Sequence, residues 1–443
     1  MNIIVSPEIV TVGMFTALLL GVLTGFPLAL PIGGVGLITG YLLFGPNAFD
    51  LIYSRLYAII TDYGFMAVPL FVFMGNMLEK SGIAEKMYDA VYIWFGKFRG
   101  GLAITSILIG TIMAACVGII AASITMLTLV ALPAMMKRGY DKGLATGSII
   151  AGGSLGILIP PSIMLIIYGP VAWISVGKLF MAAFMPGFLL SGLYILYIAI
   201  RAYLQPSMAP SAADEGRDIP FIQKTKMLFF ALGPTAILIL SVMGAIYFGL
   251  ASPTEAAAVG SAVATLLTIA YGRFSWKVLK DVSIDSIKLT AMVLLIAGCS
   301  TAFVSVFLSA GGGNVVENFI LSVPGGRWGS FALVMVVCFI LGMFIDWVGI
   351  IYVLVPILAP IIPRLGFDPL WFAMMIIVNL QMSFLTPPFA YGIFFLKGAA
   401  APELKINTGD IIQGVIPFIV LIAIGLLLMI AFPQIILWLP STM

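Results

Sequence analysis

The carboxylate of Asp346 lies in an otherwise apolar run of the sequence, CFILGMFIDWVGII. A charged side chain is costly inside a bilayer, so an intramembrane carboxylate indicates a functional site by default. The chemistry that it offers there is binding of a coupling cation such as Na⁺. The structural alternative is that Asp346 accepts hydrogen bonds from backbone N–H groups and holds a turn. We favour ion binding, and we expect Asp346 to be essential for any activity that depends on the bound ion but not for folding.

Oxygen-bearing side chains also gather in two short segments, GGSLGILIPPS at 152–162 and NLQMSFLTPPFAYG at 379–392. Hard cations prefer oxygen ligands, so this set suits sodium better than a transition metal. For each hydroxyl, the competing interpretation is a hydrogen bond back to the helix backbone, which needs no ion. The candidate oxygen ligands in these segments and at the predicted hairpin tips are Ser123, Thr125, Ser154, Ser162, Asp346, Asn379, Ser383 and Thr386.

Both segments contain residues that interrupt a helix. Gly156 and the pair Pro160–Pro161 lie in the first, and Pro387–Pro388 lie in the second. Glycine weakens a helix, and proline removes a backbone donor and clashes with the preceding turn. In lipid, a broken backbone is tolerated only where protein or a water-filled cavity covers it. Helices broken at corresponding places in two halves of a chain point to the substrate and ion sites of secondary transporters. The site prediction therefore includes these five residues.

An internal repeat relates the two segments. The proline pairs are 227 residues apart, and the same offset places Gly139 on Gly366 and Asp141 on Asp368 without a gap. We predict a first repeat over residues 1–203, a cytoplasmic connector over 204–226 and a second, inverted repeat over 227–443.

The composition places these residues in a membrane protein. Hydrophobic residues make up 62% of the chain and charged residues 9%, against roughly 45–50% and about 25% in soluble domains. The predicted class is an all-α polytopic membrane protein. The sequence contains no histidine, which removes histidine-based catalysis and most metal sites, and no basic tract that would bind nucleic acid. Its three cysteines lie in apolar segments, where we expect them to pack in the core.

Each repeat is predicted to hold about five spans, one re-entrant helical hairpin and one broken helix. The hairpins are expected at about 101–136 and 328–363, because these apolar stretches are too long for one straight span and have small residues in their middle. Their tips contain three further residues of the predicted site, Gly118, Ser123 and Gly349. The broken helices are expected at about 143–168 and 369–396.

Other polar residues have structural interpretations. Residues 79–100 alternate charged and apolar side chains, which fits a helix lying along the membrane interface. The segment that contains Asp50 and Arg55 is predicted as a loop. Ser252 to Glu255 read as a capping box at a helix start, and Asp141 and Asp368 as turn or helix-start residues.

The charge distribution predicts the topology. If the connector is cytoplasmic, 17 of the 21 Lys and Arg residues face the cytoplasm and only Arg55, Lys178, Arg327 and Arg364 face outward. This bias agrees with the positive-inside rule. The first hairpin then opens from the cytoplasm, the second opens from outside, and both chain ends are periplasmic.

Function classes other than secondary transport find little support. The sequence has no G-x-x-x-x-G-K-[ST] loop for nucleotide, so ATP cannot drive transport by this chain alone. An intramembrane enzyme would need a convergent nucleophile or metal set. A channel would usually show a repeated filter or a charged ring.

Five motifs in fixed order resemble one family. They are VPLFVFMGNMLEKSGI at 68–83, LGILIPPS at 155–162, ASPTEAAAVG at 251–260, LGMFIDWVGI at 341–350 and FLTPPFAYG at 384–392. With them, the chain resembles the large (DctM-type) membrane subunit of tripartite ATP-independent periplasmic (TRAP) transporters over essentially its whole length. It departs from the family pattern at the first tip, ACVGIIAAS, which is poorer in Ser and Gly.

The resemblance implies a mechanism and partners. Such subunits lie in the bacterial or archaeal inner membrane with a small four-helix membrane subunit, and they receive an anionic organic acid from a periplasmic binding protein. Import is driven by Na⁺ and follows an elevator mechanism, with no other cofactor. Sodium sites lie at hairpin tips and helix breaks, and by motif position the resemblance implies Ser154, Asp346, Ser383 and Thr386 as sodium ligands. The alternative is a standalone ion-coupled carboxylate carrier of the wider ion-transporter superfamily, which needs no binding protein.

Overall fold

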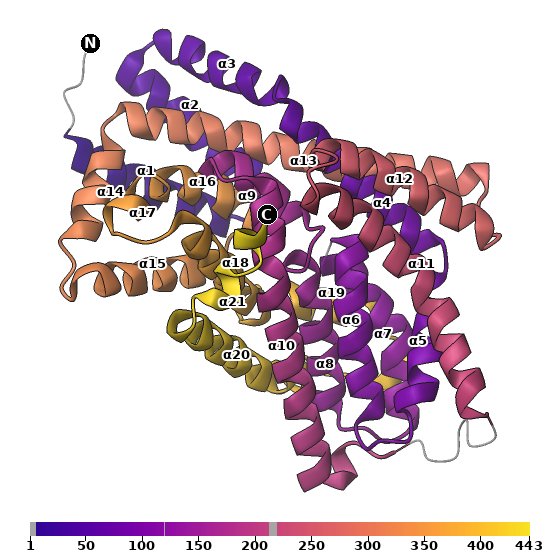
Figure 1. Ribbon diagram of the computed structural model, residues 1–443. Helices are drawn as coiled ribbons and strands as arrows, with labels where there is room; N and C mark the ends of the chain where they lie inside the picture. The colour runs from indigo at the N-terminus through magenta and orange to yellow at the C-terminus, as the bar shows by residue number, and fades with distance from the viewer. Residues whose placement is uncertain (1–5, 119, 212–218) are drawn as a thin grey trace.

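The computed structural model describes residues 6–118, 120–211 and 219–443, and every regular element in these residues is a helix (Figure 1). Within the described chain, six helices are long and apolar enough to cross a membrane, or seven if one bent pair counts as a single span. The all-α membrane class predicted from composition is therefore confirmed.

The first half of the chain forms ten α-helices. They are α1 (Pro7–Leu23), α2 (Ala29–Phe44), α3 (Asn47–Ile60), α4 (Ala67–Lys80), α5 (Ile83–Phe95), α6 (Gly101–Val117), α7 (Ile120–Lys137), α8 (Lys142–Ser154), α9 (Ile163–Ala172) and α10 (Val176–Leu204).

The second half continues with eleven. They are α11 (Phe221–Tyr247), α12 (Pro253–Ala270), α13 (Trp276–Ser309), α14 (Gly312–Leu321), α15 (Gly326–Gly342), α16 (Trp347–Leu358), α17 (Ile361–Arg364), α18 (Pro369–Leu385), α19 (Tyr391–Ala399), α20 (Thr408–Ala431) and α21 (Gln434–Leu437).

The offset of 227 residues relates these two sets of helices. It places α1 on α11, α2 on α12, α3 and α4 together on α13, α5 on α14, α6 on α15, α7 on α16 and α17, and α8, α9 and α10 on α18, α19 and α20. Local geometry agrees, since Gly139 and Gly366 both have a φ of +74°. The carboxylates of Asp141 and Asp368 accept from Leu144 N at 2.9 Å and Trp371 N at 2.8 Å, which confirms them as helix-start residues.

The helix interruptions lie where the sequence predicts them. Gly118 ends α6 with a φ of +64°, and residues 343–346 separate α15 from α16. The first tip includes residue 119, which lies outside the described residues. The segments 155–162 and 386–390 separate α8 from α9 and α18 from α19, with a short 3-10 turn at Leu155–Ile157 in the first. The re-entrant direction of the hairpins, the inverted topology and the boundaries of the repeats remain predictions.

Two helices were not predicted. The segment with Asp50 and Arg55, expected to be a loop, is helix α3: it buries Ala48 and Ile52, packs on α13, and leaves the charged side chains exposed. Helix α14 also packs on its neighbours through a narrow apolar face. Both are short amphipathic helices, whose charges resemble those of loops. The capping box at Ser252 and Glu255 is confirmed.

Glycines allow α2 to lie close to α13 (Figure 1). A Cβ added at Gly36 would be 2.9 Å from the Cα of Phe303, and one added at Gly33 would be 2.8 Å from Cys299 Sγ. The pair α4 and α12, related to α2 and α13 by the offset, is packed similarly, since a Cβ at Gly260 would meet Met74 Sδ at 2.5 Å. Small residues permit this approach of helices in lipid.

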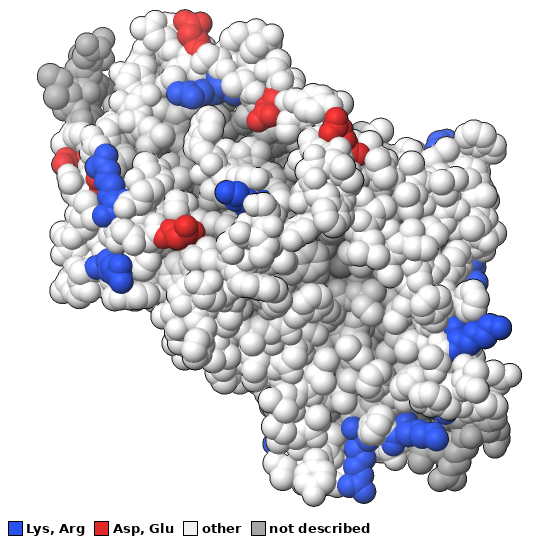
Figure 2. Space-filling model, in the orientation of Figure 1, with Lys and Arg blue, Asp and Glu red and all other residues white. Residues whose placement is uncertain are grey.

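Charges are separated across the molecule. On the face shown in Figure 2, both blue and red atoms lie at the upper left, whereas the coloured atoms at the lower right are blue only. The lower right is the end where α10 finishes and α11 begins (Figure 1). This pattern is consistent with a cytoplasmic connector.

Candidate functional site

A cavity of about 470 Å³ lies where the two hairpin tips and the two helix breaks come together. It is also bounded by residues 27–29 before and at the start of α2, and by residues 289–296 of α13. The residues from the tips and breaks that line it are Gly118, Ile120, Ala121, Ile157, Ile163, Asp346, Trp347, Val348, Phe384 and Tyr391. Two residues of the predicted site, Gly118 and Asp346, thus share one cavity.

Four helices begin at this cavity. Ile120, Ile163, Trp347 and Tyr391, the first residues of α7, α9, α16 and α19, all line it. The first-turn N–H groups of a helix have no acceptor within the helix, and the N-terminal end of its dipole carries a partial positive charge. The cavity is therefore surrounded by backbone groups that favour an anion.

Asp346 is the only Asp, Glu, Lys or Arg among the described residues that line the cavity. It occupies the N-cap position of α16, with φ −62° and ψ 149°. One turn further on, Gly349 does not line the cavity: a Cβ there would be 2.6 Å from Leu28 Cδ2, so this glycine allows α16 to approach Leu28. The cavity thus combines anion-attracting backbone with a single carboxylate and no cationic side chain.

The first tip is packed directly against the first break. A Cβ added at Gly118 would lie 3.1 Å from Pro161 O, and Gly118 also needs its left-handed φ. Within the break, the Ser162 hydroxyl donates to Ile157 O and satisfies one of the carbonyls freed by the interruption. Gly156, Pro160 and Pro161 are buried.

The second tip is joined to the second break by a backbone hydrogen bond, from Phe389 N to Met343 O at 3.3 Å. Pro387 and Pro388 are exposed, unlike the first proline pair. The second break is therefore open to the surface, whereas the first is enclosed by protein.

The predicted hydroxyl ligands have hydrogen-bond acceptors of their own. Ser154 donates to Ala151 O at 2.9 Å, Ser383 to Phe339 O at 3.1 Å and Thr386 to Met382 O at 2.8 Å. None of the three lines the cavity. Ser123 is also buried outside the cavity lining, and its Oγ has no partner among the described residues. Sodium ligation by Ser154, Asp346, Ser383 and Thr386 remains a prediction.

Sequence reasoning missed Gln381. This side chain is fully buried, and its Nε2 donates to Ser154 O at 3.2 Å, one turn before the cavity-lining residues Ile157 and Phe384. Its Oε1 has no partner among the described residues. The repeat contained the signal, because the offset of 227 places Ser154 on Gln381 itself. The bond therefore joins equivalent points of the two halves.

The family model and the relatives of similar sequence indicate one family. Residues 12–435 match the family model for the DctM component of the tripartite ATP-independent periplasmic transporter. The C4-dicarboxylate TRAP transporter large permease protein DctM of Pseudomonas aeruginosa is 28% identical over 90% of this chain and 91% of its own length. The ectoine TRAP transporter large permease protein TeaC of Halomonas elongata is 29% identical over 94% of this chain and 96% of its own.

One further relative and one solved structure extend the comparison. The isethionate TRAP transporter permease protein DctMQ of Oleidesulfovibrio alaskensis is 28% identical over 96% of this chain but only 65% of its own length. The Alcanivorax borkumensis YdaH transporter has a similar fold, with a TM-score of 0.63 at 18% identity over 88% of this chain and 90% of that one. The match of the family model across nearly the whole sequence shows that the chain belongs to the DctM family, the large permease subunits of TRAP transporters.

Proposed function

We propose that this large permease subunit imports an organic acid together with Na⁺. The observation that carries the proposal is the cavity, in which four helix N-termini surround a space lined by one carboxylate and by no Lys or Arg among the described residues. Backbone N–H groups can bind the carboxylate of a substrate. A substrate anion beside Asp346 would place two negative charges in low dielectric, which is costly unless a cation accompanies them.

The named substrates of the relatives support an acidic ligand. Their names specify C4-dicarboxylates, ectoine and isethionate, compounds that each carry a carboxylate or a sulfonate. We therefore propose a carboxylate-type substrate. One relative carries the combined name DctMQ, and the family description calls the transporter tripartite and periplasmic. Both support a complex with a small four-helix membrane subunit and a periplasmic binding protein that delivers the substrate.

The position of the cavity supports an elevator mechanism. Residues of the tips and breaks line this cavity together with residues at the start of α2 and in α13. In such a mechanism, the body that contains α6–α9 and α15–α19 carries the substrate past a scaffold that contains α2 and α13. The inner-membrane location with periplasmic chain ends belongs to the same proposal.

The test is substrate uptake by proteoliposomes that contain the complete complex and its loaded binding protein. Replacing external Na⁺ with K⁺ is expected to abolish accumulation; equal uptake in both salts would reject sodium coupling. Copurification with the small subunit tests the assembly, and a large subunit that is pure and active alone would favour the standalone carrier.

Asp346→Ala is expected to abolish Na⁺-driven uptake while the purified complex keeps its elution profile and unfolding midpoint, because the carboxylate faces a cavity. Asp50→Ala, which removes an exposed carboxylate of α3, is the matched control and should transport normally. Unchanged uptake by Asp346→Ala would remove this residue from the coupling site.

A further inference from the structure

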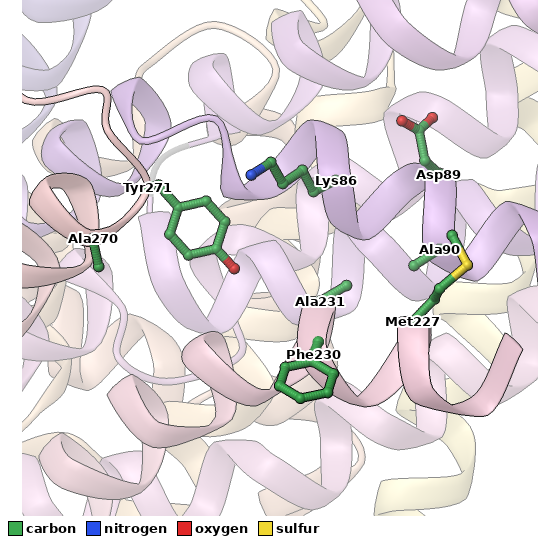
Figure 3. A pocket seen from close by; sticks show the side chains of 8 residues that line it. All are labelled: Lys86, Asp89, Ala90, Met227, Phe230, Ala231, Ala270 and Tyr271. Atoms are coloured by element: carbon green, nitrogen blue, oxygen red, sulfur yellow. The ribbon is translucent and has the colours of Figure 1, made fainter. Parts of the chain in front are cut away.

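A groove of about 550 Å³ lies between α5, α11 and α12, apart from the central cavity (Figure 3). The residues that line it are Lys86, Asp89 and Ala90 of α5, Met227, Phe230 and Ala231 of α11, and Ala270 and Tyr271 at the end of α12. Deeper between α5 and α11, Thr235 Oγ1 donates to Met87 Sδ at 3.1 Å, so these helices are held together beside the groove.

Two unlike charges flank this apolar groove. The Nζ of Lys86 lies 4.4 Å from the centroid of the Tyr271 ring. The carboxylate of Asp89 points away from this ring and from the Lys86 ammonium (Figure 3). Neither side chain forms an ion pair with a described residue, and both are exposed. The pKa of Asp89 is raised, mainly because the carboxyl group is partly buried and to a smaller extent because the negative charge of Glu85 is nearby. This is expected for a carboxylate without a cationic partner.

The groove lies at an end of the molecule that is rich in basic residues. It lies where α11 begins and α12 ends, near Lys224, Lys226 and Arg273, at the basic end of the molecule. Beyond it, α11 and α12 continue with large exposed apolar side chains such as Ile237, Leu240 and Leu266. A ligand with a charged head and long apolar chains would match both parts.

We propose that the groove binds a phospholipid with an ethanolamine headgroup, its phosphate at Lys86 and its ammonium at Asp89. The acyl chains would lie along the apolar faces of α11 and α12. A glycerol headgroup has no cation for Asp89. A choline headgroup has a cation without N–H donors, whereas the ethanolamine ammonium can donate hydrogen bonds to the carboxylate. The pair of opposite charges therefore selects the zwitterionic headgroup that carries N–H groups.

The test is thermal unfolding of the delipidated, purified complex in detergent with added phosphatidylethanolamine, phosphatidylcholine or phosphatidylglycerol. A ligand that binds the folded state raises its unfolding midpoint. We expect phosphatidylethanolamine to give the largest rise in the wild type at equal lipid concentration. Equal rises with ethanolamine and choline lipids, or a larger rise with the glycerol lipid, would overturn the proposal.

Variants locate the effect. Asp89→Asn should need at least tenfold more phosphatidylethanolamine for the same rise and should lose its preference over phosphatidylcholine, whereas Lys86→Gln should weaken the response to all three phosphate-bearing lipids. Asp281→Asn and Lys97→Gln change exposed charges outside the groove and should respond as the wild type does. An undiminished preference in Asp89→Asn contradicts the proposal. So does a lipid response of the isolated large subunit that disappears in the complex, which would assign the groove to a partner protein.

Discussion

The side-chain amide of Gln381 joins the two halves of the chain at equivalent positions. Its Nε2 holds the carbonyl of Ser154, while its Oε1 faces no described donor. A charged group in place of this buried amide would destabilise the protein, because the surrounding residues offer little solvation. Its polarity is therefore more important to the fold than its size.

We expect Gln381→Glu to destabilise the protein by about 3 kcal/mol at neutral pH, because an ionised carboxylate would face the Ser154 carbonyl oxygen without water. Lowering the pH should reduce this loss, since a protonated carboxyl group can donate to the same oxygen. Unfolding midpoints measured across pH would check both statements.

Gln381→Met is the matched comparison. It keeps the length of the side chain and removes both the donor and the unpaired acceptor, so its effect should stay below about 1 kcal/mol. Equal losses in the Glu and Met variants would show that the shape of the side chain, and not its charge, is critical.

At the scale of the elements, the contact of α2 with α13 depends on which glycine of α2 faces its partner. Gly36 faces the backbone of Phe303, but a Cβ added at Gly34 would meet nothing within 4 Å. The two positions lie on the same helix and differ only in the face that they occupy. They therefore separate close packing from helix propensity.

Gly36→Ala is expected to lower stability by about 1–3 kcal/mol, because the added methyl group must push α2 away from α13. Gly34→Ala should be neutral or slightly stabilising, since alanine favours a helix over glycine. Thermal unfolding of the two purified variants measures the difference. Comparable destabilisation by both substitutions would indicate that the glycines act through backbone flexibility instead.

The helices also show how far sequence can predict this fold. The breaks were predictable because prolines and glycines act locally, at Pro160–Pro161 as at Pro387–Pro388. Helices α3 and α14 were missed because a narrow amphipathic face depends on what packs against it. For the site, residue type identified Asp346, but not whether Ser154 and Ser383 face the cavity or donate to carbonyls. That choice depends on side-chain direction, which residue type does not specify.

At the scale of the whole molecule, the offset of 227 residues and the distribution of charge together predict two inverted repeats with a cytoplasmic connector. Arg327 belongs to the predicted outer face and Lys277 to the predicted inner face, and both side chains are exposed. They are therefore suitable positions at which to test the orientation of the chain.

Arg327→Cys and Lys277→Cys can be compared in a background in which Cys116, Cys299 and Cys338 are replaced by alanine. A membrane-impermeant maleimide applied to spheroplasts should label the Arg327→Cys variant and spare the Lys277→Cys variant until the membrane is opened. The reverse pattern would invert the topology, and transport by the cysteine-free background serves as the control for folding.

The long helix α13 has a mechanical consequence. Its counterpart in the first half is divided into α3 and α4, with a bend of 51° between residues 60 and 63, whereas α13 runs unbroken for 34 residues, a length of about 50 Å at 1.5 Å per residue. The first half of the molecule therefore contains a bend between two helices where the second half contains one continuous helix. We therefore expect a force on the scaffold to change the angle at Thr61 and Asp62 more readily than it bends α13. We expect two halves built from matching parts to differ in stiffness.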